Sequence, residues 1–302
     1  MTSLARRGLN VVEVRYRGSE RSDGDERSVD NYRHAGAYGE LEKVATFVDP
    51  QFPEERRVES PTANLGTIGG QIADAVAGGV RQGKATVMVG GDCSHITGVL
   101  GGWQDVHGSD ARIGLVWFDA HGDFNTSRTT LSGMLGGMPV AVAAGLDFPE
   151  WREGSHMAAP IPTDRILMVD VRNLDPAEEQ LVRATSIQIA APAEGFPGMD
   201  LTEAIEDLAS RCDYLYLHID SDILDARFVP NHGTKEPNGP DIAQVSAAID
   251  TVMATGKVVA FAIVSVYGRG EGAEITRASA VELMKAGLTS WERHGLPDWT
   301  IE

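Results

Sequence analysis

The sequence predicts an α/β protein with three layers, an α/β/α arrangement in which helices cover both faces of a mainly parallel sheet. Short, continuous apolar runs alternate along the 302 residues with longer amphipathic stretches. Such runs are typical of strands buried on both faces, and strands joined through helical crossovers pair in parallel. The composition agrees, because 42% hydrophobic and 23% charged residues is an ordinary globular balance and excludes disordered and fibrous classes.

The individual elements follow from these runs in chain order. Strands are predicted at 9–14, 85–89, 113–118, 166–171, 214–219 and 258–264. Helices are predicted at 64–82, 96–106, 137–144, 177–184, 201–209, 241–254 and 274–286. Residues 18–32 are charged and poor in apolar side chains, which favours a mobile loop. No linker rich in proline and serine divides the chain, so we expect residues 1–302 to form a single domain.

The charge balance limits the partners. The formal net charge is -18, from 26 Lys and Arg against 44 Asp and Glu, and such a surface repels nucleic-acid phosphates and anionic membranes. There is no apolar run long enough to cross a membrane and no signal-peptide core after the basic residues 1–7. Two cysteines, Cys93 and Cys212, are too few for a disulfide framework. We therefore expect a cytoplasmic protein without nucleic-acid or membrane partners.

Three predicted strands lead directly into polar clusters. The clusters are GGDCS at 90–94, DAHGD at 119–123 and DSD at 220–222. In extended chain, residues two apart point the same way, so Asp119, His121 and Asp123 can converge, and so can Asp220 and Asp222. Ligands of parallel α/β sheets bind at the carboxyl ends of the strands. The clusters therefore predict the functional site.

Four carboxylates in one cleft indicate a metal centre. Like charges raise each other's pKa, and a divalent cation removes that conflict. Carboxylate and imidazole ligands suit Mn²⁺, Zn²⁺, Fe²⁺ or Ni²⁺, and this many ligands favours two ions. The alternative is that the aspartates only form turns and cap helices. Two separate clusters at two strand ends make metal binding the stronger interpretation.

These residues also resemble a known family, the ureohydrolases, which include arginases and agmatinases. The family's DAHxDxNT motif stands here as DAHGDFNT at 119–126, SGNLHGxP as SGMLGGMP at 132–139 and DVDPxE as NLDPAE at 173–178. DxDxxDP stands as DSDILD at 220–225 and GTGTP as NHGTK at 231–235. The matches run in order from about Gly90 to Thr276. The resemblance implies an arginase-like fold and hydrolysis of a C–N bond in a guanidino group.

The resemblance also implies residue roles. Two Mn²⁺ ions per chain would be bound, with Asp119 and Asp220 bridging them. Asp123 and Cys93 would complete the coordination of one ion, and His121 and Asp222 that of the other. Asn125 and Ser132 would contact the α-carboxylate of an amino-acid substrate, and Asp175 and Glu178 would lie near its α-amino group. Asp123 would also pass a proton to the leaving amine, and Thr234 would stabilise the tetrahedral intermediate.

Three positions depart from the family pattern. Cys93 stands where GGDHS supplies a metal-binding histidine, and a thiolate is a softer ligand that could favour Zn²⁺ or Fe²⁺. Gly136 replaces the histidine of SGNLHG that shuttles protons. Ser265 replaces the glutamate of DIVEVNP that pairs with the substrate guanidinium. Among possible substitutes for the shuttle, His95, His218 and His232, a structural role is the stronger interpretation for each.

The departures favour a head group less basic than arginine's guanidinium, because a buried charge without a counter-ion is costly. The chain is similar to the amidinohydrolases of D-cycloserine biosynthesis, which convert Nω-hydroxy-L-arginine to hydroxyurea and L-ornithine. Another guanidino or formimidoyl amino acid is the first alternative, and a non-catalytic arginase-like protein is the second. A short segment after the last predicted helix weakens an arginase-type trimer, so both a monomer and a homo-oligomer stay open.

Overall fold

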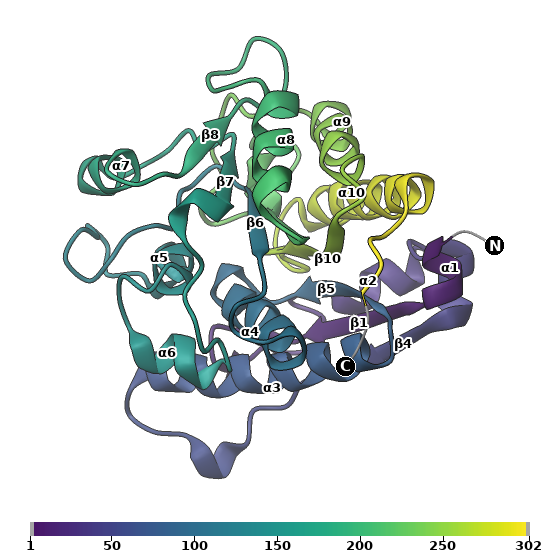
Figure 1. The fold of residues 1–302 in the computed structure, drawn as a ribbon, viewed down its shortest axis with the longest axis horizontal. Coiled ribbons are helices and arrows are strands. Elements are labelled where there is room, and N and C mark those ends of the chain that lie inside the picture. Colours follow the sequence, from purple (N-terminus) through teal and green to yellow (C-terminus); the bar gives the residue numbers. More distant parts are fainter. Residues whose placement is uncertain (1–2, 300–302) are drawn as a thin grey trace.

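The computed structural model describes residues 3–299. Eight parallel strands form the central sheet, in the order β4-β1-β5-β10-β9-β6-β7-β8 (Figure 1). In chain order they are β1 (Leu9–Val14), β4 (Ala45–Val48), β5 (Ala85–Gly90), β6 (Ile113–Phe118), β7 (Ile166–Val169), β8 (Gln188–Ala190), β9 (Tyr214–Asp220) and β10 (Val258–Val264). The expected mainly parallel sheet is confirmed.

Helices cover both faces of the sheet, as the three-layer prediction requires. One face packs against α3 (Pro61–Arg81), α4 (Ile96–His107) and α5 (Pro139–Ala143). The other packs against α8 (Leu201–Arg211), α9 (Ile242–Met253) and α10 (Ala273–His294). The remaining helices are α1 (Ser3–Arg7), α2 (Val29–His34), α6 (Pro149–Gly154) and α7 (Pro176–Arg183). In the described residues, no helix is both long and apolar enough to cross a membrane.

The six predicted strands are present, and the two strands of this eight-stranded sheet that were not predicted lie at its edges. β4 is only half-buried and β8 has three residues. Edge strands have one partner and bury less apolar surface, so their apolar runs are short. The segment 18–32, predicted to be a mobile loop, holds part of a small antiparallel ribbon of β2 (Tyr16–Arg17) and β3 (Glu20–Arg21), and the start of α2. Arg15 anchors it by bonding Asp30 at 2.7 Å.

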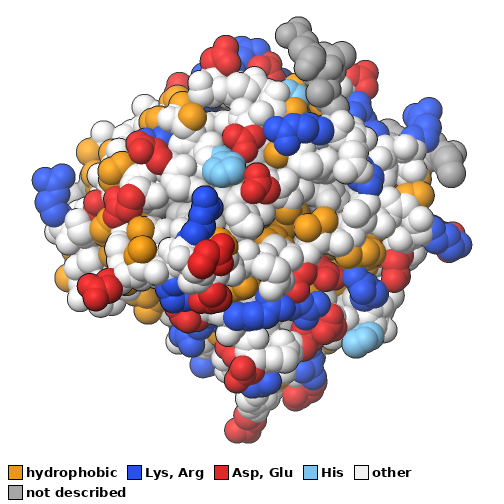
Figure 2. Space-filling model, turned by 90° about the horizontal axis from the view of Figure 1, so that it is seen from below, with side chains coloured by type: hydrophobic (Ala, Val, Ile, Leu, Met, Phe, Trp, Pro, Cys, Tyr) orange, Lys and Arg blue, Asp and Glu red, His pale blue; other side chains and the backbone are white. Residues whose placement is uncertain are grey.

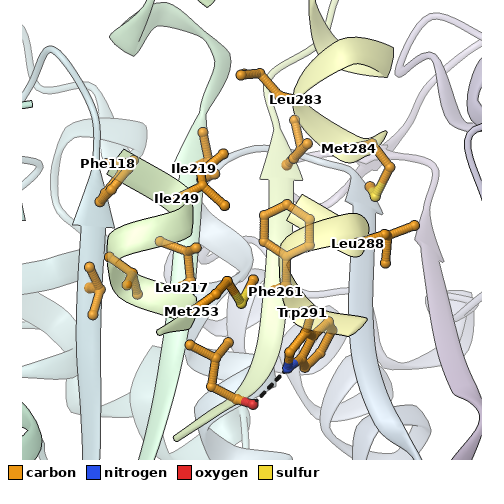
Figure 3. Packing of buried hydrophobic residues seen from close by; sticks show 14 of the residues in the cluster. Phe118, Leu217, Ile219, Ile249, Met253, Phe261, Leu283, Met284, Leu288 and Trp291 are labelled. Carbon is orange, nitrogen blue, oxygen red and sulfur yellow. Dashed lines mark hydrogen bonds between the residues drawn. The ribbon is translucent and has the colours of Figure 1, made fainter. Parts of the chain in front are cut away.

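Central strand β10 and helix α10 show how the core is packed (Figure 3). Phe261 of β10 meets Trp291 edge-to-face, with ring centroids 6.4 Å apart. Trp291 is fully buried, and its indole N–H donates to the carbonyl of Val258 at 2.9 Å. Gly287 allows this close approach, since a Cβ there would lie 2.5 Å from the Phe261 ring. Strand and helix are therefore held in one register, which fixes the sheet beneath the site.

The surface carries charges of both signs. On the face in Figure 2, acidic and basic side chains are interspersed and form no continuous basic patch. Several of them are paired, such as Arg57 with Glu54 and Glu20 at 2.7 Å each. Exposed pairs of this kind contribute little to stability, because water and salt screen the two charges.

Candidate metal centre

The carboxyl ends of the central strands open into a cavity of about 670 Å³. Its walls include all of the predicted metal ligands, namely Cys93, Asp119, His121, Asp123, Asp220 and Asp222. The predicted substrate residues Asn125, Ser132, Asp175 and Glu178 and the predicted catalytic Thr234 also line it. Segments that lie far apart in the sequence thus meet because parallel strands end at one edge of the sheet.

Each strand-end aspartate divides its two oxygens between the turn and the cavity. Asp119 Oδ1 accepts from the backbone N–H of His121 at 2.7 Å, and Asp220 Oδ1 accepts from the N–H of Asp222 at 3.0 Å. The second oxygens face Cys93, whose Sγ lies 3.7 Å from Asp119 Oδ2 and 3.0 Å from Asp220 Oδ2. Turn formation and metal binding are therefore compatible roles of the same carboxylates.

At the cavity, three groups of donor atoms among the described residues lie close enough to hold an ion. They are Cys93 with Asp119 and Asp220, Asp119 with His121 and Asp222, and Asp220 with Asp222 and His232, each with its ligand atoms within 4.8 Å of one another. The first two groups share Asp119, as expected of a carboxylate between two ions. The donor set of thiol, imidazole and carboxylate suits a divalent transition metal.

The electrostatics of the cavity also favour a cation. Burial, and then the charges of neighbouring aspartates, raise the pKa of Asp119 and Asp123 well above the usual range. Burial, and then the charges of Asp220, Asp123 and Asp119, raise the pKa of the Cys93 thiol. Burial alone would lower the pKa of His121, but Asp119 and Asp222 raise it to about 12. A divalent ion would replace these protons, and it would also satisfy Asp222 Oδ1, which is buried without a hydrogen-bond partner.

Asp123 lies beside the ligand groups and belongs to none of the three. It is buried, with φ of 46°, in the left-handed region. Its backbone carbonyl accepts from the N–H groups of Val140 and Ala141 at 3.0 and 3.4 Å, which ties the loop to the start of α5. Its shared ligation with Cys93 stays a prediction.

The predicted substrate residues form one wall of the cavity. Asn125 Nδ2 donates to Asp175 Oδ2 at 3.2 Å. Ser132 is exposed, and its hydroxyl accepts from the N–H of Met134 at 3.1 Å. Glu178 is buried, and both of its oxygens accept backbone N–H groups, from Phe124 at 2.8 Å and from Asp175 at 3.1 Å. Glu178 therefore holds the wall together, which the sequence analysis did not anticipate.

The three departures lie at the cavity as well. Gly136 lines it, and a Cβ there would only touch Met134 at 3.8 Å. Ser265 follows β10 with φ of 57°, and its hydroxyl donates to Asp220 Oδ2 at 2.5 Å. The position of the missing glutamate is thus occupied by a neutral side chain that hydrogen-bonds a predicted bridging carboxylate.

Two further side chains lie beside the ligand groups, and neither was predicted as part of the metal centre. His232, for which a structural role was preferred, lies 3.4 Å from Asp220 Oδ1 and 3.5 Å from Asp222 Oδ2. Arg172 donates to the backbone carbonyl of Asp222 at 3.1 Å and to that of Glu236 at 3.2 Å. The signal for His232 was its place in the GTGTP-like stretch, where the family has threonine. The sequence gives no comparable signal for Arg172, because its hydrogen-bond partners are mostly backbone carbonyls that lie far away in the sequence.

A parallel α/β/α sheet with carboxylate, imidazole and thiol groups at its carboxyl end has the makings of a metal centre. A model of the arginase family matches residues 16–289, so the chain belongs to the arginase family. The arginase of Bacillus caldovelox is 32% identical over 168 residues, 54% of this chain and just over half, 55%, of that protein. The arginase of Bacillus subtilis is 28% identical over 221 residues, 72% of this chain and 73% of that protein.

Solved structures show the same relationship. The Bacillus caldovelox arginase superposes with a TM-score of 0.79 at 25% identity, covering 95% of this chain and 98% of that chain. A formimidoylglutamase from Bacillus subtilis has a TM-score of 0.71 at 15% identity, covering 94% and 87%. An arginase from Entamoeba histolytica, solved with L-ornithine, has a TM-score of 0.77 at 22% identity, covering 93% and 98%. The last two share the fold.

Proposed function

We propose that this protein is a binuclear-metal amidinohydrolase that cleaves a guanidino C–N bond of an arginine-like amino acid, with Nω-hydroxy-L-arginine as its best substrate. The products would be hydroxyurea and L-ornithine. The observation that carries the choice of substrate is Ser265, a neutral side chain at the position of the family's guanidinium-pairing glutamate. N-hydroxylation lowers the basicity of a guanidine, so its head group can bind uncharged.

Cys93, Asp119, His121, Asp123, Asp220 and Asp222 would hold the two ions, for which we propose Mn²⁺, with Zn²⁺, Fe²⁺ or Ni²⁺ as alternatives that the donors also suit. When bound, two such ions lower the pKa of a water between them and polarise the head group. The side chains that line the cavity would hold the substrate with the central carbon of its head group turned towards the metal ligands.

The side chains would divide the remaining work. The carboxylate of Asp123 would receive a proton and deliver it to the departing amine. Thr234, predicted to stabilise the tetrahedral intermediate, donates its hydroxyl to Asp222 Oδ2 at 2.9 Å and so holds that carboxylate in place. Asn125 and Ser132 would bind the α-carboxylate, while Asp175 would attract the α-amino group. Glu178, which also lines the cavity, would lie near the same amino group while its oxygens hold the wall together.

A substrate panel tests the proposal. Full-length protein reconstituted with manganese is incubated with Nω-hydroxy-L-arginine, L-arginine, agmatine, guanidinobutyrate and formimidoylglutamate, and the products are identified directly. We expect the highest kcat/KM with hydroxyarginine. Arginine or agmatine as the best substrate would contradict the hydroxyarginine assignment and leave the reaction class intact.

L-arginine itself is the second candidate, because the curated relatives reported above are arginases and the predicted substrate residues are present. A non-catalytic protein is the third, and metal analysis separates it from both enzymes. A metal content well under one ion per chain, together with failed reconstitution, would favour the non-catalytic protein. We further propose a cytoplasmic protein without nucleic-acid or membrane partners, as a monomer or homo-oligomer.

Restoring the carboxylate at position 265 should shift the preference towards arginine. In Ser265→Glu the guanidinium gains a counter-ion, and a charged hydrogen bond is worth about 1.5–3 kcal/mol, or roughly 10–100-fold. We expect the ratio of kcat/KM for arginine over hydroxyarginine to rise by that factor. Ser265→Gln, which has the same shape without the charge, is the control. An equal rise in both variants would exclude a charge effect.

Restoring the shuttle histidine should speed leaving-group protonation. Little crowds the cavity-lining position of Gly136, so Gly136→His can place an imidazole there. General acids contribute about 10²–10⁴-fold when well positioned, and we expect at least about 10-fold in kcat on arginine. The pH profile should gain an inflection near pH 6.5, the ordinary histidine pKa. An unchanged kcat and profile would show that proton delivery does not limit this enzyme.

A further inference from the structure

The third group of donor atoms, formed by Asp220, Asp222 and His232, is not explained by the family's pattern of ligands. His232 is 2% exposed and lines the cavity. Its Nε2 has no hydrogen-bond partner, and neither has the neighbouring Asp222 Oδ1. Both atoms offer lone pairs, and the two residues belong with Asp220 to one group whose ligand atoms lie within 4.8 Å of one another. An unpartnered polar atom that lines a cavity beside carboxylates can be satisfied by a bound ion.

The position of His232 is held from several sides. Its backbone N–H donates to the carbonyl of Val229 at 2.9 Å, and its own carbonyl accepts from Lys235 Nζ at 3.2 Å. Tyr267 packs edge-to-face on the ring, with centroids 4.9 Å apart. These contacts hold the imidazole beside Asp220 and Asp222, so it could bind a metal ion with little reorganisation.

The hydrogen bonds of Nδ1 decide what Nε2 can do. When the ring proton is on Nδ1, Nδ1–H can donate to Thr234 Oγ1 at 3.2 Å. The Thr234 hydroxyl in turn donates to Asp222 Oδ2 at 2.9 Å. Nε2 then presents a lone pair. With the proton on Nε2, Nδ1 accepts from the N–H of Thr234 at 3.3 Å, and Nε2–H faces Asp220. A metal ion would select the first tautomer, since outer hydrogen bonds commonly orient a ligating histidine.

We propose that His232 is a further protein ligand of the ion that Asp119, His121, Asp220 and Asp222 hold. This inference rests on the binuclear centre proposed above. The added imidazole, together with the Cys93 thiolate, moves the donor set away from oxygen. We therefore expect the affinity for Zn²⁺, Co²⁺ or Ni²⁺ relative to Mn²⁺ to be higher than at a centre with one histidine ligand.

The test counts imidazoles without relying on activity. X-ray absorption on the full-length protein loaded with two Zn²⁺ should show on average one imidazole per ion, from His121 and His232. In His232→Thr, which restores the family residue, the average should fall to one half. The exposed His34, changed in His34→Asn, is the control and should leave the count unchanged.

Chelator competition adds the energetic readout. Loss of an outer-shell partner weakens metal binding by about 10–100-fold, so loss of a direct ligand should exceed about 100-fold for one of the two ions. Two bound ions in the wild type with only one half imidazole per ion would overturn the inference and leave the binuclear centre standing. Fewer than two ions in the wild type would overturn both. Because the wild-type spectrum decides, a His232→Thr variant that failed to fold would not rescue the proposal.

Discussion

Replacing Cys93 with alanine is expected to remove one of the two metal ions and to reduce kcat/KM by about 10³-fold or more. The Sγ atom lies 3.0 Å from Asp220 Oδ2 in a cavity wall, and only 4% of the residue is exposed. A second ion contributes several kcal/mol of transition-state stabilisation, and each 1.36 kcal/mol is tenfold in rate. Metal content per chain and kcat/KM of the reconstituted protein check the prediction.

The chain offers two controls for this variant. Cys212 is also buried but belongs to the core beside α8, so Cys212→Ala makes the same chemical change outside the cavity and should keep both ions. Cys93→His restores the ligand of GGDHS and should bind two ions, with a preference moved from Zn²⁺ towards Mn²⁺. A Cys93→Ala protein that still bound both ions tightly would refute Cys93 as a ligand.

Replacing Arg172 with methionine should lower the free energy of unfolding by about 3–5 kcal/mol, because it breaks an ion pair and removes the charged donor from five backbone carbonyls. Arg172 pairs with Asp170, whose side chain is 2% exposed. It also donates to backbone carbonyls at Asp222, Ile223, Leu224, Glu236 and Pro237. Urea unfolding with m-values compared between variants measures the loss.

The same variant should also lose metal affinity, because Arg172 clamps the 236–237 segment against the turn that carries Asp222. The double variant Arg172→Met with Asp170→Asn is the control, since it removes the stranded carboxylate. Asparagine tolerates the left-handed backbone of Asp170, which has φ of 66°. Recovery of part of the stability in the double variant is expected. A loss below about 1 kcal/mol in Arg172→Met would show that the clamp contributes little.

Asp170 further predicts a pH dependence. Burial raises its pKa to about 7 despite Arg172, against an ordinary value of 3.8. The folded state therefore holds this proton more tightly than the unfolded state does. Between pH 3.8 and about 7 the contribution of Asp170 to stability falls as pH rises, by at most about 1.4 kcal/mol per pH unit. Stability curves of the wild type and Asp170→Asn across this range measure the difference, and parallel curves would contradict it.

The fold could be predicted wherever local sequence and burial agree. The six strands with continuous apolar runs were identified, because each is buried on both faces. β4 and β8 were missed, because an edge strand needs little apolar sequence. Helix α5 is shorter than the predicted 137–144, since Pro139 begins it and a 3₁₀ turn at Leu135–Gly137 precedes it.

The candidate site divides in a similar way. The strand-end clusters could be recognised, because spacing of two along extended chain places side chains together whatever the tertiary detail. Glu178 lines the cavity, where it was predicted to meet the substrate, and both of its oxygens also accept backbone N–H groups, which the sequence did not indicate. Only packing decides whether a carboxylate faces a ligand or its own chain.

By itself, the sequence determined that this is a parallel α/β protein with acidic clusters after β6 and β9 and a cysteine after β5, because hydrophobic periodicity and short-range spacing are local properties. Only the tertiary structure decided that His232 Nε2 and Asp222 Oδ1 are left without a hydrogen-bond partner, in two residues that line the same cavity. It also decided that Arg172 joins segments far apart in the chain. The physical reason is that parallel strands bring distant segments to one edge of a sheet. Which atoms of those segments remain unpaired there depends on hydrogen bonds that only the folded chain forms.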